Sequence, residues 1–278
     1  MTRANRLLPL LQTLMESEAA ASCIRGSAHA AHAVRAVDVL QPTLSIVMEG
    51  CKTVHCSDGD WQVRPGQMLV LCGGARLDVR HQPDAQTGRY RVLMTPLCDE
   101  VMEAVRLLWG TPGIPADLMG PWVRSVQVAD HEAVLQRWGQ SLLQGDHAGA
   151  RAALVSLLIA LAQAGMMRLV LPQQTTLSQR IRAHVMAAPA RDWQSRDVED
   201  LMGMSGATLR RHLAAEGTSL RELLAEVRLG LSLNLLYGTR LPLKTVAARV
   251  GYRSPDAFVR AFRARFGLEP SQLGRESP

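Results

Sequence analysis

The sequence has few aromatic residues and almost no lysine. Phenylalanine, tryptophan and tyrosine make up 4% of the 278 residues, and phenylalanine is confined to Phe258, Phe262 and Phe266. Lysine occurs only at Lys52 and Lys244, so the net charge of +6 rests on arginine. Arginine has the forked geometry that suits phosphate and guanine, although genomic base composition can produce the same bias. The clustering of the scarce phenylalanines beside arginines is therefore the feature to explain.

Cysteine is too sparse for a disulfide framework. Its five copies are an odd number, which favours a reducing compartment over secretion. The N-terminal segment has an arginine start, but its apolar run is broken by Pro9, Gln12 and Glu16, so it is interpreted as mature chain rather than signal peptide. We therefore expect a cytoplasmic protein.

One apolar run, residues 152–171, is long enough to be considered as a membrane span. It contains Ser156, Gln163, Gly165 and Arg168, which make it a poor one. A buried or subunit-facing helix is the preferred interpretation, and a membrane-anchored regulator is the alternative.

The positive charge is concentrated in the last hundred residues. Residues 1–178 contain 15 basic and 15 acidic side chains, whereas residues 179–278 contain 16 and 10. The length and the 47% hydrophobic content are sufficient for two folded domains. One neutral domain joined to one that meets a polyanion is expected.

Residues 42–71 contain short β-rich runs separated by turn signals, and a further pair of strands is expected at 75–80 and 89–95. The first hundred residues therefore predict a small antiparallel sandwich or barrel. The turn signals are at 49–50, 57–60 and 64–66.

The pattern becomes helical after Cys98. Helices are expected at 99–109, 130–143 and 146–163, and the last two form a helical hairpin. Asp146 is the expected N-cap of the second helix of the hairpin.

The C-terminal hundred residues contain an internal repeat. The segment VEDLMGMSGATLRRHL begins at Val198, and VAARVGYRSPDAFVRAF begins at Val246. Each predicts a helix–turn–helix with a glycine in the turn and a serine N-cap on an amphipathic second helix. The matching pairs are Val198 with Val246, Gly203 with Gly251, Ser205 with Ser254, Leu209 with Phe258, and Leu213 with Phe262.

The repeat explains the clustered phenylalanines. At 100° per residue they fall within a stripe of about 80°, while Arg260 and Asp256 lie on the other side of the helix. In the first copy Leu209 and Leu213 form the inner stripe and Arg211 lies opposite. A basic outer face on such a helix suits the DNA major groove.

Between the copies, Ser219 and Glu222 predict a capping box, and Gly238 a helix end. A helix from 219 to 237 would span about 28 Å at 1.5 Å per residue. This length is close to the ~34 Å of one DNA turn, so two recognition helices could enter successive major grooves.

These segments resemble the DNA-binding domain of the AraC/XylS family of bacterial transcription regulators over about 95 residues. The resemblance implies a double helix–turn–helix that binds arrays of promoter half-sites. Gly206, Ala207, Pro255 and Val259 are smaller or less polar than the family's usual readers, and Leu273 replaces its closing aromatic. The expected base-reading residues are Ala207, Arg210, Arg211, Asp256 and Arg260. The expected backbone contacts are Ser205, Lys244, Arg249, Arg253, Ser254 and Arg263.

Residues 41–71 are similar to the sensor domains of the same family. This likeness implies a cupin-like β-barrel for an effector and a helical hairpin for dimerisation, although the same hairpin side chains serve equally as core. The expected dimerisation residues are Leu135, Trp138, Leu142, Leu154, Leu158 and Leu161. The predicted domains are a β-rich sensor (1–98), a helical dimerisation segment (99–171), a linker (172–178) and the DNA-binding domain (179–278).

Signals for catalysis are weak. A catalytic cupin needs a His-x-His with a carboxylate and a later histidine. His29 and His32 are placed before the strands at helical spacing, and are interpreted as surface or capping histidines. Gly73 and Gly74 lack phosphate-loop spacing, and no Ser/His/Asp set stands out. We expect no enzyme, no cofactor and no metal.

Cys51, His55 and Cys56 are the candidates for metal or thiol sensing. In an extended strand Cys51 and His55 lie about 13 Å apart and Cys56 faces the other side. They form one site only if a bulge or turn intervenes, so a buried cysteine acting as a small hydrophobe is favoured.

The sequence thus predicts an α+β protein, with an N-terminal cupin-like antiparallel β-barrel and helical hairpin before an all-α double helix–turn–helix domain. The predicted function is a transcription regulator, expected to be an activator and a homodimer. Its expected partners are double-stranded promoter DNA, RNA polymerase and an effector of unknown identity. The alternative is a cupin-type metalloenzyme, or a metal or thiol sensor, fused to a DNA-binding module.

Overall fold

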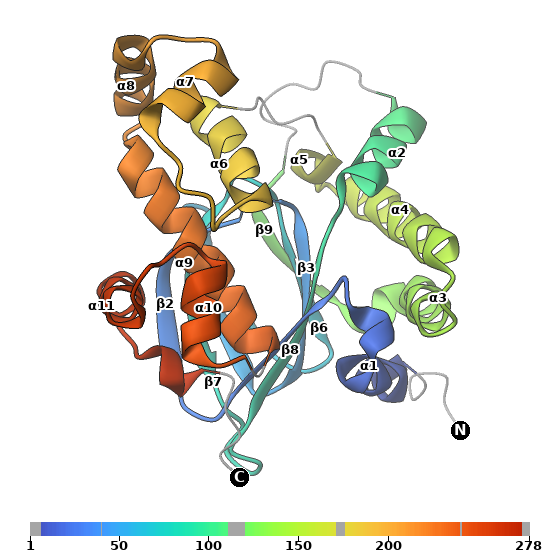
Figure 1. Ribbon diagram of the computed structural model, residues 1–278. Coiled ribbons are helices and arrows are strands. Elements are labelled where there is room, and N and C mark those ends of the chain that lie inside the picture. The colour runs from blue at the N-terminus through green and yellow to red at the C-terminus, as the bar shows by residue number, and fades with distance from the viewer. Residues whose placement is uncertain (1–6, 40, 111–119, 171–175, 240, 274–278) are drawn as a thin grey trace. The chain divides into compact units, whose positions relative to one another are not determined.

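The computed structural model describes residues 7–39, 41–110, 120–170, 176–239 and 241–273. The chain divides into two compact units, Met1–Gln173 and Gln174–Pro278 (Figure 1). The first is built on antiparallel sheets and the second from helices, which confirms the predicted α+β class. Of the predicted linker 172–178, residues 172–175 lie outside the described part of the chain.

The first unit has two sheets of antiparallel strands. One has the order β1-β8-β3-β6-β9 and the other the order β2-β7-β4-β5. A tight turn at Gly50 (φ +80°) joins β3 to β4 where the sequence predicts one. The strands are β1 (Ile24–Ala28), β2 (His32–Asp38), β3 (Thr43–Glu49), β4 (Cys51–Cys56), β5 (Gly59–Val63), β6 (Gln67–Leu71), β7 (Arg76–Gln82), β8 (Tyr90–Pro96) and β9 (Val123–Gln127).

Alternating side chains build a core between the two sheets. Strand β7 reads RLDVRHQ, and every second side chain is buried, as the pleat requires. Val54 and Val79 of the four-stranded sheet belong to one apolar cluster with Val47, Leu69 and Val92 of the five-stranded sheet. The two sheets therefore face each other as a sandwich.

Helices cover the outer side of the five-stranded sheet (Figure 1). Leu44, Ile46 and Met68 on this side of the sheet belong to a second apolar cluster with Leu135 and Leu157 of the helices. Strands β3 and β6 are thus buried on both faces. The helices are α1 (Leu7–Glu16), η2 (Glu18–Ala20), α2 (Asp99–Trp109), η4 (Val128–His131), α3 (Glu132–Leu143), α4 (His147–Gln163) and α5 (Met167–Val170).

The helical hairpin α3–α4 is present, and Asp146 caps α4 by accepting a hydrogen bond from the Gly149 N–H at 2.9 Å. The expected dimerisation side chains all belong to the core of this unit. A dimer contact through the hairpin stays a prediction, and it would have to use the exposed side of the hairpin. The expected dimerisation side chains are Leu135, Trp138, Leu142, Leu154, Leu158 and Leu161.

The apolar run 152–171 is divided between two helices. Helix α4 ends at Gln163, Gly165 (φ +95°) reverses the chain, and α5 follows. Within the described residues, no helix has both the length and the apolar character needed to cross a membrane. Leu157 and Leu161 are 1% exposed, which confirms the prediction of a buried helix.

Three elements of the first unit differ from the sequence-based prediction. His32 does not precede the strands but begins β2, which corrects its interpretation as a surface or capping histidine. The predicted helical segment 99–171 also contains β9, which pairs with β6. Helix α1 packs on α3 through Leu11 and Leu14, which are buried. Each of these short segments is stabilised by partners distant in sequence, which local patterns do not reveal.

The second unit is entirely helical where it is described. Its longest helix, α9, contacts α6, α10 and α11. Two cysteine-free helix pairs, α7–α8 and α10–α11, lie before and after α9 along the chain. The helices are α6 (Leu177–Ala187), α7 (Ser195–Met202), α8 (Gly206–Ala215), α9 (Leu220–Gly238), α10 (Leu243–Arg249), α11 (Pro255–Phe266) and η5 (Pro270–Gln272). Leu273, in place of the family's aromatic residue, is 2% exposed and therefore well packed.

Candidate nucleic-acid interface

The first helix pair has the expected turn. Helix α7 ends at Gly203, which has left-handed geometry (φ 67°, ψ 36°). Ser205 then caps α8 by accepting a hydrogen bond from the Thr208 N–H at 3.3 Å. Leu209 and Leu213 are 1% exposed and hold the inner face of α8 in the core. The sequence predicts each of these features.

The second helix pair repeats this arrangement under tighter packing. Gly251 has φ +85°, and a Cβ atom there would lie 2.5 Å from the carbonyl oxygen of Pro189. Ser254 caps α11 by accepting from the Ala257 N–H at 3.4 Å, and Pro255 occupies the first turn of α11. Only glycine satisfies both the dihedral angle and the space at position 251.

A ladder of aromatic rings anchors the inner face of α11 in the core. The centroids of Phe258 and Phe262 are 5.6 Å apart, and those of Phe262 and Phe266 are 4.7 Å apart. Tyr252, in the turn, extends the ladder at 5.4 Å from Phe258. Phe258 and Phe262 are fully buried, whereas Arg260 and Arg263 between the rings are exposed. The predicted anchoring stripe is confirmed.

The outer faces of α8 and α11 carry the predicted base-reading residues, and all of them are exposed. Within the described part of the chain, Arg210, Arg211 and Arg260 make no hydrogen bond or ion pair, so their guanidinium donors are available to a ligand. Asp256 lies one helical turn before Arg260 on α11. Contact of these residues with bases stays a prediction.

The predicted phosphate-contacting residues differ in exposure and in their partners. Ser205, Lys244 and Arg249 are exposed. Arg253 and Arg263 instead form exposed ion pairs, the first with Asp192 at 2.8 Å and the second with Glu269. Ser254, the remaining member, is half-buried. Exposed pairs of this kind are worth about 0.2–1 kcal/mol, so a DNA phosphate can replace them.

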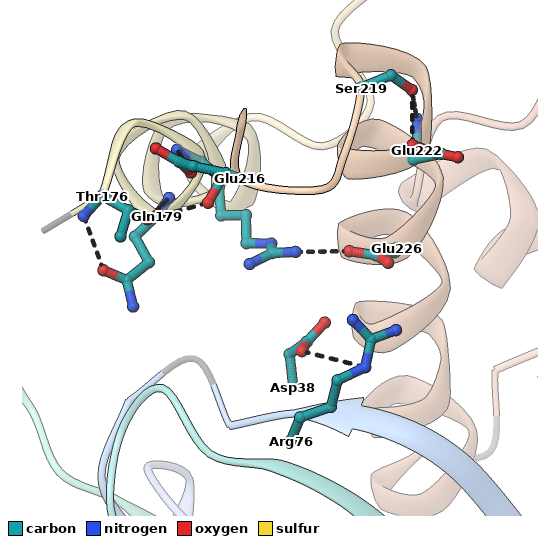
Figure 2. A network of polar contacts seen from close by, with 10 residues as sticks. Asp38, Arg76, Thr176, Gln179, Glu216, Ser219, Glu222 and Glu226 are labelled. Carbon is teal, nitrogen blue, oxygen red and sulfur yellow. Dashed lines mark hydrogen bonds and ion pairs between the residues drawn. The ribbon is translucent and has the colours of Figure 1, made fainter. Parts of the chain in front are cut away.

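A polar network ties the start of α6 to the end of α8 (Figure 2). The Glu216 carboxylate accepts hydrogen bonds from the backbone N–H groups of Leu177 and Ser178, both at 3.0 Å. Thr176 and Gln179 add a reciprocal capping box. Burial alone would raise the pKa of Glu216, but the hydrogen bonds from Ser178, Leu177 and Thr176 outweigh it and lower the pKa.

Sequence reasoning missed the Glu216 cap because its partners lie almost forty residues away. The nearest local signal, the predicted Ser219–Glu222 capping box, is only half present. Ser219 accepts from the Glu222 N–H at 3.3 Å, but its hydroxyl also donates to the Glu222 carboxylate (Figure 2). A second long-range pair joins Arg182 to Glu226 at 2.6 Å.

The candidate sensing residues of the first unit do not converge. His55 pairs with Asp60 at 2.6 Å on the exposed side of β4, and Cys56 accepts from the Asp58 N–H. Burial raises the pKa of the Cys72 thiol to about 12, which disfavours its thiolate. Among the described residues, no group of three or more His, Cys, Asp or Glu side chains is arranged to hold a metal ion.

Comparison with known proteins supports the interpretation of the second unit. Residues 199–276 match the family model described as "Helix-turn-helix domain". The chain is 33% identical over 100 residues to the urease operon transcriptional activator of Escherichia coli, covering 36% of this chain and 34% of that protein. It is 36% identical over 105 residues to the ornithine utilization regulator of Pseudomonas aeruginosa, covering 38% and 31%. The chain thus matches about a third of the length of these curated relatives.

The fold of both units resembles that of ToxT from Vibrio cholerae. A structure of apo ToxT superposes with a TM-score of 0.67 at 12% identity, covering 90% of this chain and 96% of that one. A structure of ToxT bound to an unsaturated fatty acid gives a TM-score of 0.64 at 12% identity, with 90% and 94% covered. At this identity the likeness establishes the fold alone. The duplicated, arginine-faced helix–turn–helix and these sequence matches show that the second unit is a helix–turn–helix domain of the AraC type, similar to that of transcription regulators.

Proposed function

We propose that the chain is a sequence-specific DNA-binding transcription regulator. One observation supports this most directly: two helix–turn–helix pairs each bury one stripe of the second helix and expose arginines on the opposite side. A guanidinium fork pairs with the two acceptors of guanine in the major groove. Burial of the inner stripe fixes the orientation of the outer one, so the readers are held in place before DNA arrives.

The exposed side chains divide the work of binding. Arg210, Arg211, Asp256 and Arg260 read bases, together with the small Ala207, which allows close approach of α8. The backbone group of Ser205, Lys244, Arg249, Arg253, Ser254 and Arg263 positions the duplex without reading sequence. The N-termini of α8 and α11 add backbone N–H groups that favour phosphate.

The first unit regulates this binding. We propose that it binds a small effector and pairs two chains as a homodimer, which together set how two DNA-binding units meet the promoter. The name of the urease operon relative supports a role as an activator. We propose RNA polymerase as the partner of such an activator. The ToxT structure with a bound fatty acid supports an effector site in a protein of this fold. Such a regulator would act in the cytoplasm.

Genome-wide mapping of bound sites tests the function, followed by fluorescence anisotropy on the sites found. Arg211→Ala should lower the affinity for a mapped site by about 1–3 kcal/mol and leave the affinity for random duplex nearly unchanged. The matched control is Arg151→Ala, which removes an exposed arginine from α4 in the first unit. Equal affinity of the unaltered chain for mapped and random duplexes would refute sequence-specific binding.

A further inference from the structure

One segment of the second unit, residues 188–194 between α6 and α7, contacts both helix–turn–helix pairs. On the side of the first pair, Trp193 is 8% exposed and belongs to one apolar cluster with Leu209 of α8. The Arg191 guanidinium also pairs with Asp197, in the first turn of α7, at 2.6 Å. The segment is therefore part of the folded core of the first pair.

The turn of the second pair lies against the same segment. Gly251, in the turn between α10 and α11, has φ +85°, and a Cβ atom there would lie 2.5 Å from the Pro189 carbonyl oxygen and 3.2 Å from the Ala190 Cα. Backbone atoms packed this closely allow little relative movement. Tyr252, the next residue, contacts the ring of Phe258 on α11. The segment thus links the core of the first pair to the turn that begins α11.

Arg228, on α9, holds the segment at this junction. Its Nε donates a hydrogen bond to the Pro189 carbonyl at 3.1 Å, and its Nη2 donates one to the Arg191 carbonyl at 2.9 Å. The same guanidinium lies against the second pair, because a Cβ atom at Gly251 would be 3.0 Å from the Arg228 Nε. Burial raises the pKa of Tyr252, and the nearby charge of Arg228 opposes that rise. One half-buried side chain therefore contacts the segment and the turn at once.

This junction uses the forked shape of arginine. Two donors in one rigid plane reach two carbonyls that are two residues apart, and hydrogen bonds from a charged donor are stronger than neutral ones. The helices also have other connections, because α8 contacts α6, which packs on α9, and α11 contacts both α10 and α9. Loss of the Arg228 fork would therefore leave each helix–turn–helix pair folded and would loosen the junction between them.

We propose that Arg228 is a positioning residue that sets the spacing between the two DNA half-sites that the chain accepts. It locks the 188–194 segment against the turn that begins α11, and this fixes α8 and α11 relative to each other. The inference rests on the proposed function, since it requires both helices to read one site. One added base pair moves a half-site by about 3.4 Å along the duplex and turns it by roughly 35°, which a locked pair of helices cannot follow. A loosened junction follows it in part.

Fluorescence anisotropy of the full chain tests the proposal on a mapped site and on the same site with one base pair inserted between its half-sites. The half-sites are assigned as the positions whose base preference disappears in Arg211→Ala and in Arg260→Ala. The insertion should weaken binding of the unaltered chain at least about tenfold, as expected when one set of base contacts is displaced. In Arg228→Met this ratio of affinities should fall at least about fivefold, the lower end of typical couplings between sites.

The ratio of affinities separates positioning from stability. A purely structural arginine would lower the affinity for both duplexes by the same factor and leave their ratio unchanged, and that result overturns the proposal. The matched control is Arg221→Met, which removes an exposed arginine from the first turn of the same helix and should preserve the ratio. An equal fall of the ratio in this control would show a general effect of charge and would also overturn the proposal.

The Arg228→Lys variant covers the case in which the methionine variant does not fold. It keeps the charge and can reach one of the two carbonyls, but it has no fork to reach both. Its ratio of affinities should fall below that of the unaltered chain. An unchanged ratio in folded Arg228→Lys protein, verified by thermal melting followed by circular dichroism, contradicts the positioning role.

The same titrations separate this inference from the proposed function. Equal affinity of the unaltered chain for mapped and random duplexes refutes the proposed function. A chain that prefers mapped sites but binds both spacings equally, or whose Arg228 variants keep the ratio, refutes the positioning role alone.

Discussion

Replacing Gly251 by alanine should damage the second unit far more than the same change at Gly203. Both residues follow the first helix of a helix–turn–helix pair and both have positive φ. At Gly203 an added Cβ meets no described atom within 4 Å, whereas at Gly251 it would lie 2.5 Å from the Pro189 carbonyl oxygen and 3.0 Å from Arg228 Nε. Backbone strain from the positive φ is thus common to both variants, whereas the steric clash occurs only in Gly251→Ala.

The structure sets the magnitude of the difference. The left-handed conformation costs a non-glycine residue about 1–2 kcal/mol, which is the whole effect expected for Gly203→Ala. At Gly251 the alanine must also displace the Pro189 carbonyl, which accepts a hydrogen bond from Arg228 Nε at 3.1 Å. Losing a hydrogen bond to a charged group adds about 1.5–3 kcal/mol. Gly251→Ala should therefore cost about 2.5–5 kcal/mol in total.

Urea unfolding of the full chain, monitored by fluorescence, measures both variants. Trp193 is the only tryptophan after residue 173, is 8% exposed, and donates to the Ala188 carbonyl at 2.9 Å beside the displaced loop. Hydrogen exchange of peptides from α9 and α10 separates the second unit from the first. If the two variants lose the same stability, the close approach to Pro189 contributes nothing and the reasoning fails.

Three further predictions concern the same unit. Phe262→Ala should reduce the free energy of unfolding by about 3–5 kcal/mol, because it removes the central ring of the ladder, and the smaller loss expected for Phe262→Leu is the control in urea unfolding. Arg260→Ala should weaken binding to a mapped site by about 1–3 kcal/mol, whereas Arg253→Ala should weaken binding to all duplexes alike and reduce its salt dependence. Equal losses of affinity for mapped and random duplexes in both variants, measured by fluorescence anisotropy, would contradict this division. Because the pKa of Glu216 is lowered in the folded chain, its ionised carboxylate stabilises the fold fully above the unfolded-state pKa, and this stabilisation is lost as the pH falls through the folded-state pKa. In urea unfolding at a series of pH values, Glu216→Gln should therefore remove part of the fall in the free energy of unfolding on the acid side.

The second unit could be predicted well because its signals are local. A glycine that ends a helix, a serine that caps the next and apolar residues at helical spacing all lie within one turn of each other. Ser205, Ser254 and the buried Phe258 are found where the sequence places them. The repetition of the pattern also excludes coincidence, which a single helix–turn–helix would not.

Contacts between distant segments could not be predicted in the same way. Strand β9 is short and gains its hydrogen bonds from β6, some fifty residues earlier, so its own sequence says little. The helical spacing of His29 and His32 suggests surface or capping histidines, but the alternation of apolar residues in HAVRAVD is the stronger signal and places His32 at the start of β2. The Glu216 cap and the buried pairing of Lys52 with His81 arise only when the fold brings separate elements together.

The ion pairs of Arg253 and Arg263 bear on how DNA is engaged. In the proposed complex with DNA, their partners Asp192 and Glu269 would compete with phosphate for these two guanidinium groups. Because exposed pairs contribute only about 0.2–1 kcal/mol, exchanging each carboxylate for a phosphate requires little free energy. Under the proposed DNA binding, a phosphate that fails to displace the carboxylate would meet its negative charge, which would disfavour a misplaced duplex. The arginines of α8 and Arg260 of α11 have no such partner among the described residues, so this exchange would concern the proposed backbone contacts of the second helix–turn–helix and not the proposed base readers of either one.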